Sequence, residues 1–192
     1  MDISLFKAFR AKLALGHRRD AAVSLGVFIR SLDTLAKKRQ FTEWLLAQRD
    51  GRRMAQRHEL WTDVVLPVLL DGYAKGDACS TYWLAMINGN PWLTGGKTAL
   101  DLLKQCLSSH WEPARVRQSL LAELLRGFEY AVHEWPSGIL VSANGATDEQ
   151  CNLIFSDVAL ARELDADGKH AAFLDDFEDK VRLYQTRLQR KS

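Results

Sequence analysis

The stretch KGDACSTYWLAMINGNPW, from Lys75 to Trp92, holds the start, the body and the end of one helix. Asp77 is placed to cap this helix, because its side chain can accept hydrogen bonds from the free amides of the first turn. The residues that follow, as far as Ile87, are apolar on nearly all sides, which is typical of a helix buried inside a protein. The segment from Asn88 to Pro91 then ends it, since asparagine, glycine and proline favour turns.

Upstream of this stretch, apolar residues recur at the three- and four-residue spacing of α-helices. We expect one helix that starts at the N-cap Asp20 and runs through Leu25 to Ala36 with its apolar residues on one face. The segment from Leu60 to Tyr73 is apolar almost throughout and predicts a helix in the middle of the protein. Pro67 lies inside that segment, and its ring and missing N–H predict a kink or a division into two helices.

Downstream, Pro113 suits the first position of a long amphipathic helix, because its missing N–H would be unpaired there in any case. Thr147 to Gln150 matches a capping box, in which the end side chains bind each other's backbone amides. A last helix follows Asp167-Gly168, and it carries oppositely charged residues one turn apart. These pairs are Asp176–Lys180 and Glu178–Arg182.

The only strand-like run is GILVS, from Gly138 to Ser142, and it is too short and too isolated to found a sheet. The sequence therefore predicts an all-α fold of stacked antiparallel helical hairpins, with about eight or nine helices. The hairpins form either a tetratricopeptide-like array or an irregular helical bundle. A chain of 192 residues suits one domain, residues 1–192, with basic N-terminal helices (1–60), a repeat-like hairpin (77–112) and C-terminal helices (113–192).

Residues 76–85, GDACSTYWLA, resemble the first helix of the SEL-type tetratricopeptide-like repeat, whose usual pattern is Gly-Asp-Ala-x-Ala-x-Tyr-x-Leu-Gly. Five residues match this pattern as they stand: Gly76, Asp77, Ala78, Tyr82 and Leu84. The resemblance extends from Asp77 to Glu112, a length close to the roughly 34 residues of a tetratricopeptide repeat, and it occurs once in the chain. It implies paired helices whose exposed surface holds a partner segment. The alternative is an irregular bundle that contains one such hairpin.

Four tryptophans are candidate partner-binding residues, since Trp is enriched where interfaces bind most tightly. Trp83 occupies a repeat position that is usually polar and faces outward, so it either packs under a neighbouring helix or contacts a partner. The apolar helix around Trp83 favours burial. Trp92, Trp111 and Trp135 fall at expected helix ends or loops, where we expect partial exposure. The loop from Pro136 to Asp148 is the longest irregular connection and a further contact candidate.

Charge is distributed unevenly along the chain. Residues 1–60 carry 13 Lys and Arg against 6 Asp and Glu, whereas residues 61–192 carry 13 against 18, which together give the net charge of +2. The densest basic segment runs from Arg49 to His58, and on a single helix Arg49, Arg53 and Arg57 would line one face. Such a face suits an acidic protein partner, nucleic-acid phosphates or plain solvent. Nucleic acid is the less favoured partner, because no aromatic residues alternate with the arginines and no helix-turn-helix pattern follows.

The sequence carries no recognisable motif for a cofactor or a metal ion. TGGKT, from Thr94 to Thr98, ends like a phosphate-binding loop, but Pro91 stands where that loop needs its first glycine. His58-Glu59 and His133-Glu134 both lack the second histidine of a zinc-protease motif. We therefore expect no cofactor and no metal site. The same expectation holds for the remaining histidines, His17, His110 and His170.

Three widely spaced cysteines favour reduced, structural thiols and hence a cytoplasmic location: Cys79, Cys106 and Cys151. No apolar run approaches the roughly 18 residues of a membrane span, so we expect no membrane association. The partner that stacked helical hairpins suggest is another protein. Together the features predict a non-catalytic protein-interaction module of the adaptor, scaffold or inhibitor type. One alternative is a regulator that contacts nucleic acid through the Arg49–Arg57 stripe. Another is an enzyme on a helical scaffold, for which His133 and Glu134 are the first residues to test.

Overall fold

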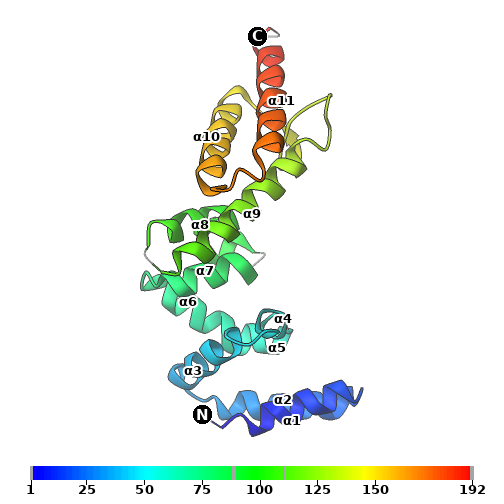
Figure 1. Cartoon of the computed structure of the whole chain (residues 1–192). Coiled ribbons are helices and arrows are strands. Elements are labelled where there is room, and N and C mark those ends of the chain that lie inside the picture. Colours follow the sequence, from blue (N-terminus) through cyan, green and yellow to red (C-terminus); the bar gives the residue numbers. More distant parts are fainter. Residues whose placement is uncertain (1, 88–89, 110, 191–192) are drawn as a thin grey trace. The chain divides into compact units, whose positions relative to one another are not determined.

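The structure, a computed structural model, describes residues 2–87, 90–109 and 111–190 (Figure 1). Asn88 and Gly89, expected to end the helix of the opening stretch, and His110 lie outside the described residues. The all-α prediction is confirmed, because helices dominate and the strands are two residues each. The structure groups the chain into two compact units, residues 1–102 and 103–192, with the boundary inside helix α8.

Unit 1 is a succession of helices joined by short turns. Counting the continuous run α5–η1–α6 as one helix, the described residues form nine longer helices, as expected, and one short additional helix, α4. The elements of unit 1 are α1 (Ser4–Ala14), α2 (Arg18–Ser31), α3 (Leu35–Leu46), α4 (Gly51–Ala55), α5 (His58–Leu60), the π-helix η1 (Trp61–Val65), α6 (Leu66–Ala74), α7 (Ala78–Ile87), the 3-10 helix η2 (Pro91–Thr94) and the first turn of α8 (Ala99–Leu107).

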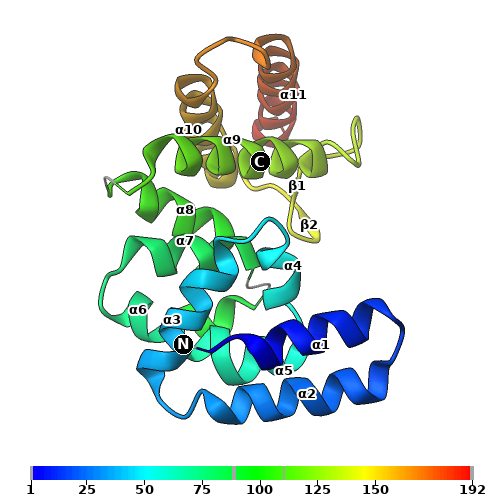
Figure 2. The same cartoon turned by 60° about the horizontal axis from the view of Figure 1, so that its bottom comes forward.

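An aromatic cluster forms the core where α1, α2 and α3 meet. Helices α1 and α2 lie side by side as an antiparallel hairpin (Figure 2). Phe6 on α1 contacts four other rings at centroid distances of 5.0 to 5.8 Å, and it is completely buried. Those rings belong to Phe9, Phe28, Phe41 and Trp44. Tilted and edge-on ring pairs of this kind add to the stabilisation that burial alone provides.

The helix expected from Asp20 to Ala36 is two helices in the structure. Helix α2 begins earlier, so that Asp20 lies in its first turn, and it ends at Ser31. Thr34 then caps α3, because its side-chain oxygen accepts a hydrogen bond from the amide of Lys37 at 3.2 Å. The apolar spacing continues across the junction of α2 and α3. Such a periodic pattern does not show where one helix ends and the next begins.

Pro67 neither divides nor sharply ends its helix. The chain passes from α5 through η1 into α6, with Pro67 in the first turn of α6. The amide of Leu66 donates to the carbonyl of Trp61, a five-residue step typical of a π-turn. The wider turn gives the proline ring room where an α-helical carbonyl would clash with it, so the helical run continues.

Lys75, Gly76 and Asp77 form the joint between α6 and α7. Gly76 has a left-handed backbone (φ 75°), and the amide of Asp77 donates to the carbonyl of Gly72 at 2.9 Å, which closes α6 with a Schellman motif. Asp77 then caps α7, because its carboxylate accepts a hydrogen bond from the amide of Ser80 at 2.8 Å, as the sequence predicts. The short joint makes α6 and α7 neighbours.

Gly72 allows α6 and α7 to approach closely. A Cβ atom at this position would lie 2.0 Å from the hydroxyl oxygen of Ser80 and 2.6 Å from its Cβ. We expect Gly72→Ala to lower the free energy of unfolding by about 1–3 kcal/mol, because the added methyl group overfills a packed contact. Chemical denaturation of the variant tests this. Adding Ser80→Gly should restore part of the loss, and a double variant as unstable as the sum of the two single ones would contradict the assigned contact.

Unit 2 contains three long helices and a small hairpin. These are α9 (Pro113–Ala131), β1 (Leu140–Val141), β2 (Asn144–Gly145), α10 (Asp148–Leu164) and α11 (Ala171–Gln189). Pro113 opens α9 as predicted, and the expected stripe of Val116, Leu120, Leu124 and Phe128 is buried. Phe128 stacks on Phe177 of α11 with a centroid distance of 4.5 Å, so α9 and α11 share one apolar core.

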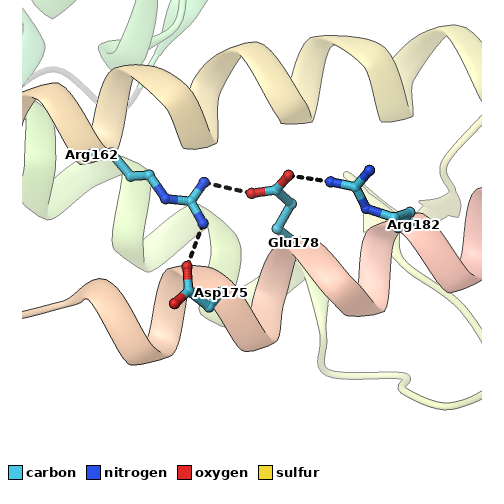
Figure 3. A network of polar contacts seen from close by, with 4 residues as sticks. All are labelled: Arg162, Asp175, Glu178 and Arg182. Carbon is cyan, nitrogen blue, oxygen red and sulfur yellow. Dashed lines mark hydrogen bonds and ion pairs between the residues drawn. The ribbon is translucent and has the colours of Figure 1, made fainter.

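The ends and the outer face of α10 and α11 match the sequence prediction closely. The capping box of Thr147 and Gln150 is present at the start of α10. Both predicted ion pairs of α11 form, Asp176–Lys180 and Glu178–Arg182. Arg162 of α10 joins this network by binding Asp175 at 2.6 Å and Glu178 at 2.5 Å (Figure 3). Arg162 and Asp175 are exposed and Glu178 is half-buried, so each of these surface pairs contributes at most about 1 kcal/mol.

Candidate functional site

Trp92 is the most exposed large apolar residue among those that the structure describes. It lies in the turn Pro91–Thr94, named the Trp92 turn here, with 87% of its surface accessible, and Leu93 beside it is 38% exposed. The Asn90 side chain accepts a hydrogen bond from the Trp92 amide at 3.2 Å. The amide of Gly96 donates to the Pro91 carbonyl at 2.9 Å, which closes the turn. An indole is therefore held outward on an internally hydrogen-bonded frame.

Thr94 anchors this turn from beneath. Its side chain is buried, and its hydroxyl lies 2.9 Å from the carbonyl oxygens of both Pro91 and Lys97, to one of which it donates. Gly95 and Gly96 follow with left-handed backbones (φ 68° and 87°), which only glycine adopts at little cost. The buried threonine and the two glycines fix the direction in which the turn projects.

The segment from Thr94 to Thr98 thus forms a connector that ends in the cap of helix α8. The amide and the hydroxyl of Thr98 both donate to the Asp101 carboxylate, at 2.8 and 2.7 Å, and the Asp101 amide donates back to the Thr98 hydroxyl at 3.2 Å. The polar groups at the start of α8 are therefore engaged with each other. The phosphate-loop reading has no support from this geometry.

The other three candidate tryptophans are less accessible. Trp83 is buried at 8% exposure and packs edge-on against Tyr82 at 5.4 Å, as the apolar helix around it predicts. Trp111 is half-buried. Trp135 is half-buried too, because the guanidinium of Arg187 lies over its ring at 5.3 Å. Local sequence could not separate these environments, since each depends on what other helices place over the ring.

The arginine stripe expected on one helix does not exist, which corrects that prediction. Helix α3 ends at Leu46, so Arg49 lies in a turn, Arg53 lies in the short helix α4, and Arg57 precedes α5 with an extended backbone. The chain bends because Gly51 abuts the end of α3, where a Cβ atom would lie 1.9 Å from the Leu45 carbonyl oxygen. Arg49 and Arg53 are exposed, and Arg57 is half-buried.

Helix α1 contributes two contacts to this basic segment that no local pattern could reveal. Arg10 binds Asp50 at 2.7 Å across 40 positions of sequence. The Arg57 guanidinium lies over the ring of Phe9, 5.2 Å from its centroid, while the Arg57 Nε atom is buried without a hydrogen-bond partner. Arg10 and Leu93 also belong to candidate sites, although we did not expect this from the sequence. A Trp-Leu pair in one turn was an available signal for Leu93.

The loop from Pro136 to Asp148 is ordered by its neighbours, whereas we expected an irregular connection. Its centre is the hairpin β1–β2, with Leu140 paired to Gly145. The Tyr130 hydroxyl donates to the Ser142 carbonyl at 2.8 Å, and the Tyr184 hydroxyl donates to the Ala146 carbonyl at 3.1 Å. Burial raises the pKa of Tyr184 above its usual value, so this donor keeps its proton.

In residues 2–87, 90–109 and 111–190, no three His, Cys, Asp or Glu side chains gather as a metal ion would require. Across the same ranges, every helix is too short or too polar to cross a bilayer. None of the three cysteines is joined in a disulfide, and burial raises the pKa of Cys151, which keeps it protonated.

Comparison of the chain with models of protein families, with curated proteins and with solved structures found no match.

Proposed function

We propose that this chain is a non-catalytic protein-interaction module and that the Trp92 turn is its main contact surface. The observation that carries the proposal is an indole exposed at 87% on a turn fixed by hydrogen bonds. Water is a poor solvent for so large an apolar group, and covering it with a partner's surface releases free energy. Because hydrogen bonds within the turn already hold its backbone, we expect binding to lose little conformational entropy there.

Leu93 extends the same surface. It is 38% exposed and adjoins Trp92 in the chain, so the turn offers a partner both an aromatic and an aliphatic side chain. Such patches serve as the central contacts of protein interfaces, where a few residues carry most of the binding energy. The partner that fits has a shallow apolar pocket into which the indole inserts.

The likeness of residues 77–112 to a SEL-type repeat belongs to this proposal. Its support is that Asp77 caps α7 and that the matching residues Tyr82 and Leu84 are buried. Proteins built from such repeats bind partner segments on the surfaces of their stacked helices. Cysteines that are not joined in disulfides are typical of proteins in a reducing compartment, which supports a cytoplasmic setting for this interaction.

Replacing Trp92 with alanine tests the proposal. Quantitative affinity capture with the full chain as bait should recover partners whose retention falls about thirtyfold or more in Trp92→Ala, the loss expected for a residue at the centre of an interface. Leu15→Ala is the matched control, because Leu15 is 72% exposed and lies outside the turn. Far-ultraviolet circular dichroism should show both variants folded.

The partner should also shield the indole directly. Acrylamide quenching of tryptophan fluorescence should fall when a captured partner is added back to the chain, and this fall should vanish in Trp92→Ala. Partners that Trp92→Ala and Leu15→Ala retain equally well would exclude the Trp92 turn as the contact surface.

A further inference from the structure

A cluster of five arginines lies where α1 meets the segment after α3. We name it the arginine corner, and its members are Arg10, Arg49, Arg52, Arg53 and Arg57. Between Ala47 and His58 the only acidic residue is Asp50, and Arg10 binds it at 2.7 Å. Arg49, Arg52 and Arg53 are exposed, and none forms an ion pair with a described residue. The corner therefore holds a local excess of positive charge.

The backbone beneath these arginines is firmly held. Gly51 donates its amide to the Gln48 carbonyl at 3.0 Å, and the Gln48 side chain donates to the Trp44 carbonyl at 2.9 Å. Met54 and Ala55 of α4 are buried, so the short helix is anchored on its inner side. Charged side chains on an anchored segment lose less entropy on binding than those on a mobile loop.

Arg57 adds an unsatisfied donor to the corner. Its Nε atom is buried and has no acceptor, while the guanidinium rests on the ring of the fully buried Phe9. A buried donor without an acceptor costs free energy, and such groups are rare in folded proteins. A carboxylate that binds the guanidinium side-on, with a small shift of the side chain, would supply the acceptor.

We propose that the arginine corner binds a short acidic segment of a partner protein through its carboxylates. The planar guanidinium matches a carboxylate with two parallel hydrogen bonds, and this cluster is made of arginine alone. Nucleic acid fits less well. The three unpaired arginines would neutralise about three phosphates, well below the roughly six to ten contacts of strong binders. The nearby rings, Phe9 and Trp44, are buried or half-buried in the core and give bases no platform to stack on.

The test measures binding of a fluorescein-labelled peptide of alternating Glu and Ala residues to the full chain by anisotropy. In Arg49→Ser/Arg53→Ser, we expect the affinity to fall about tenfold or more, because two charge-assisted contacts are lost. The matched control is Arg19→Ser/Arg30→Ser on α2, which removes the same charge from exposed, unpaired positions of unit 1. That variant should change the affinity less than about twofold, as screening weakens distant charges.

Two further measurements make the outcome decisive. A labelled DNA strand of equal charge should bind more weakly than the peptide at the same ionic strength. Equal losses in the two double variants, tighter binding of the DNA, or no binding of the peptide to the native chain would each overturn the proposal. Trp92→Ala should leave peptide binding unchanged, so this inference and the Trp92 turn succeed or fail separately.

Discussion

Replacing Gly51 with alanine is expected to lower the free energy of unfolding of unit 1 by about 3 kcal/mol or more. The new Cβ would lie 1.9 Å from the Leu45 carbonyl oxygen, 2.8 Å from the Leu45 carbonyl carbon and 3.1 Å from the Leu46 Cα. All three are backbone atoms at the end of α3, so no side-chain rotation can relieve the clash. Either α4 moves away from α3 or the last turn of α3 unwinds, and both expose buried Met54 and Ala55.

Urea denaturation followed by circular dichroism measures the loss, and hydrogen exchange should locate it in α3 and α4. Gly26→Ala is the matched control in the same unit. Gly26 lies inside α2, and a Cβ atom there meets only the Arg30 guanidinium at an ordinary 3.6 Å. That variant should gain about 0.5–1 kcal/mol, since alanine loses less backbone entropy than glycine on folding. A Gly51→Ala protein as stable as the native chain would mean that α3 and α4 do not meet as described.

Replacing Phe6 with alanine is expected to cost about 3–5 kcal/mol, the range for removing a buried aromatic side chain. Phe6 is completely buried and contacts rings of α1, α2 and α3, so the cavity would open at the junction of three helices. Its neighbours cannot collapse into the space, because Phe28 and Phe41 already pack edge-on against each other at 4.7 Å. The variant should lose the hydrogen-exchange protection of all three helices together.

Phe6→Leu is the control for this prediction. Leucine keeps most of the apolar volume, so the expected loss is about 1–1.5 kcal/mol, and helices α9 to α11 should keep their exchange rates in both variants. Equal stability of Phe6→Ala and the native chain would show that the aromatic cluster is not the core of unit 1.

The features that sequence alone determined are those set by neighbours in the chain. The capping box of Thr147, the cap at Asp77 and the ion pairs of α11 all join residues within four positions, and such contacts recur wherever the local conformation forms. The helical class follows from the spacing of apolar residues, because that spacing gives each helix one face to bury. The exposure of Trp92 could be anticipated from its place just after Pro91 at a helix end.

Tertiary structure alone decided which predicted surfaces exist. Arg49, Arg53 and Arg57 share helical spacing, yet the contact of Gly51 with α3 bends the chain between them. Asp50 is neutralised by Arg10 from 40 positions away, and Trp83 is buried at a repeat position that is usually polar and faces outward. Spacing along a chain specifies which side chains share a face when a helix forms. Whether the helix continues, and what covers that face, depends on packing between segments that no local pattern encodes.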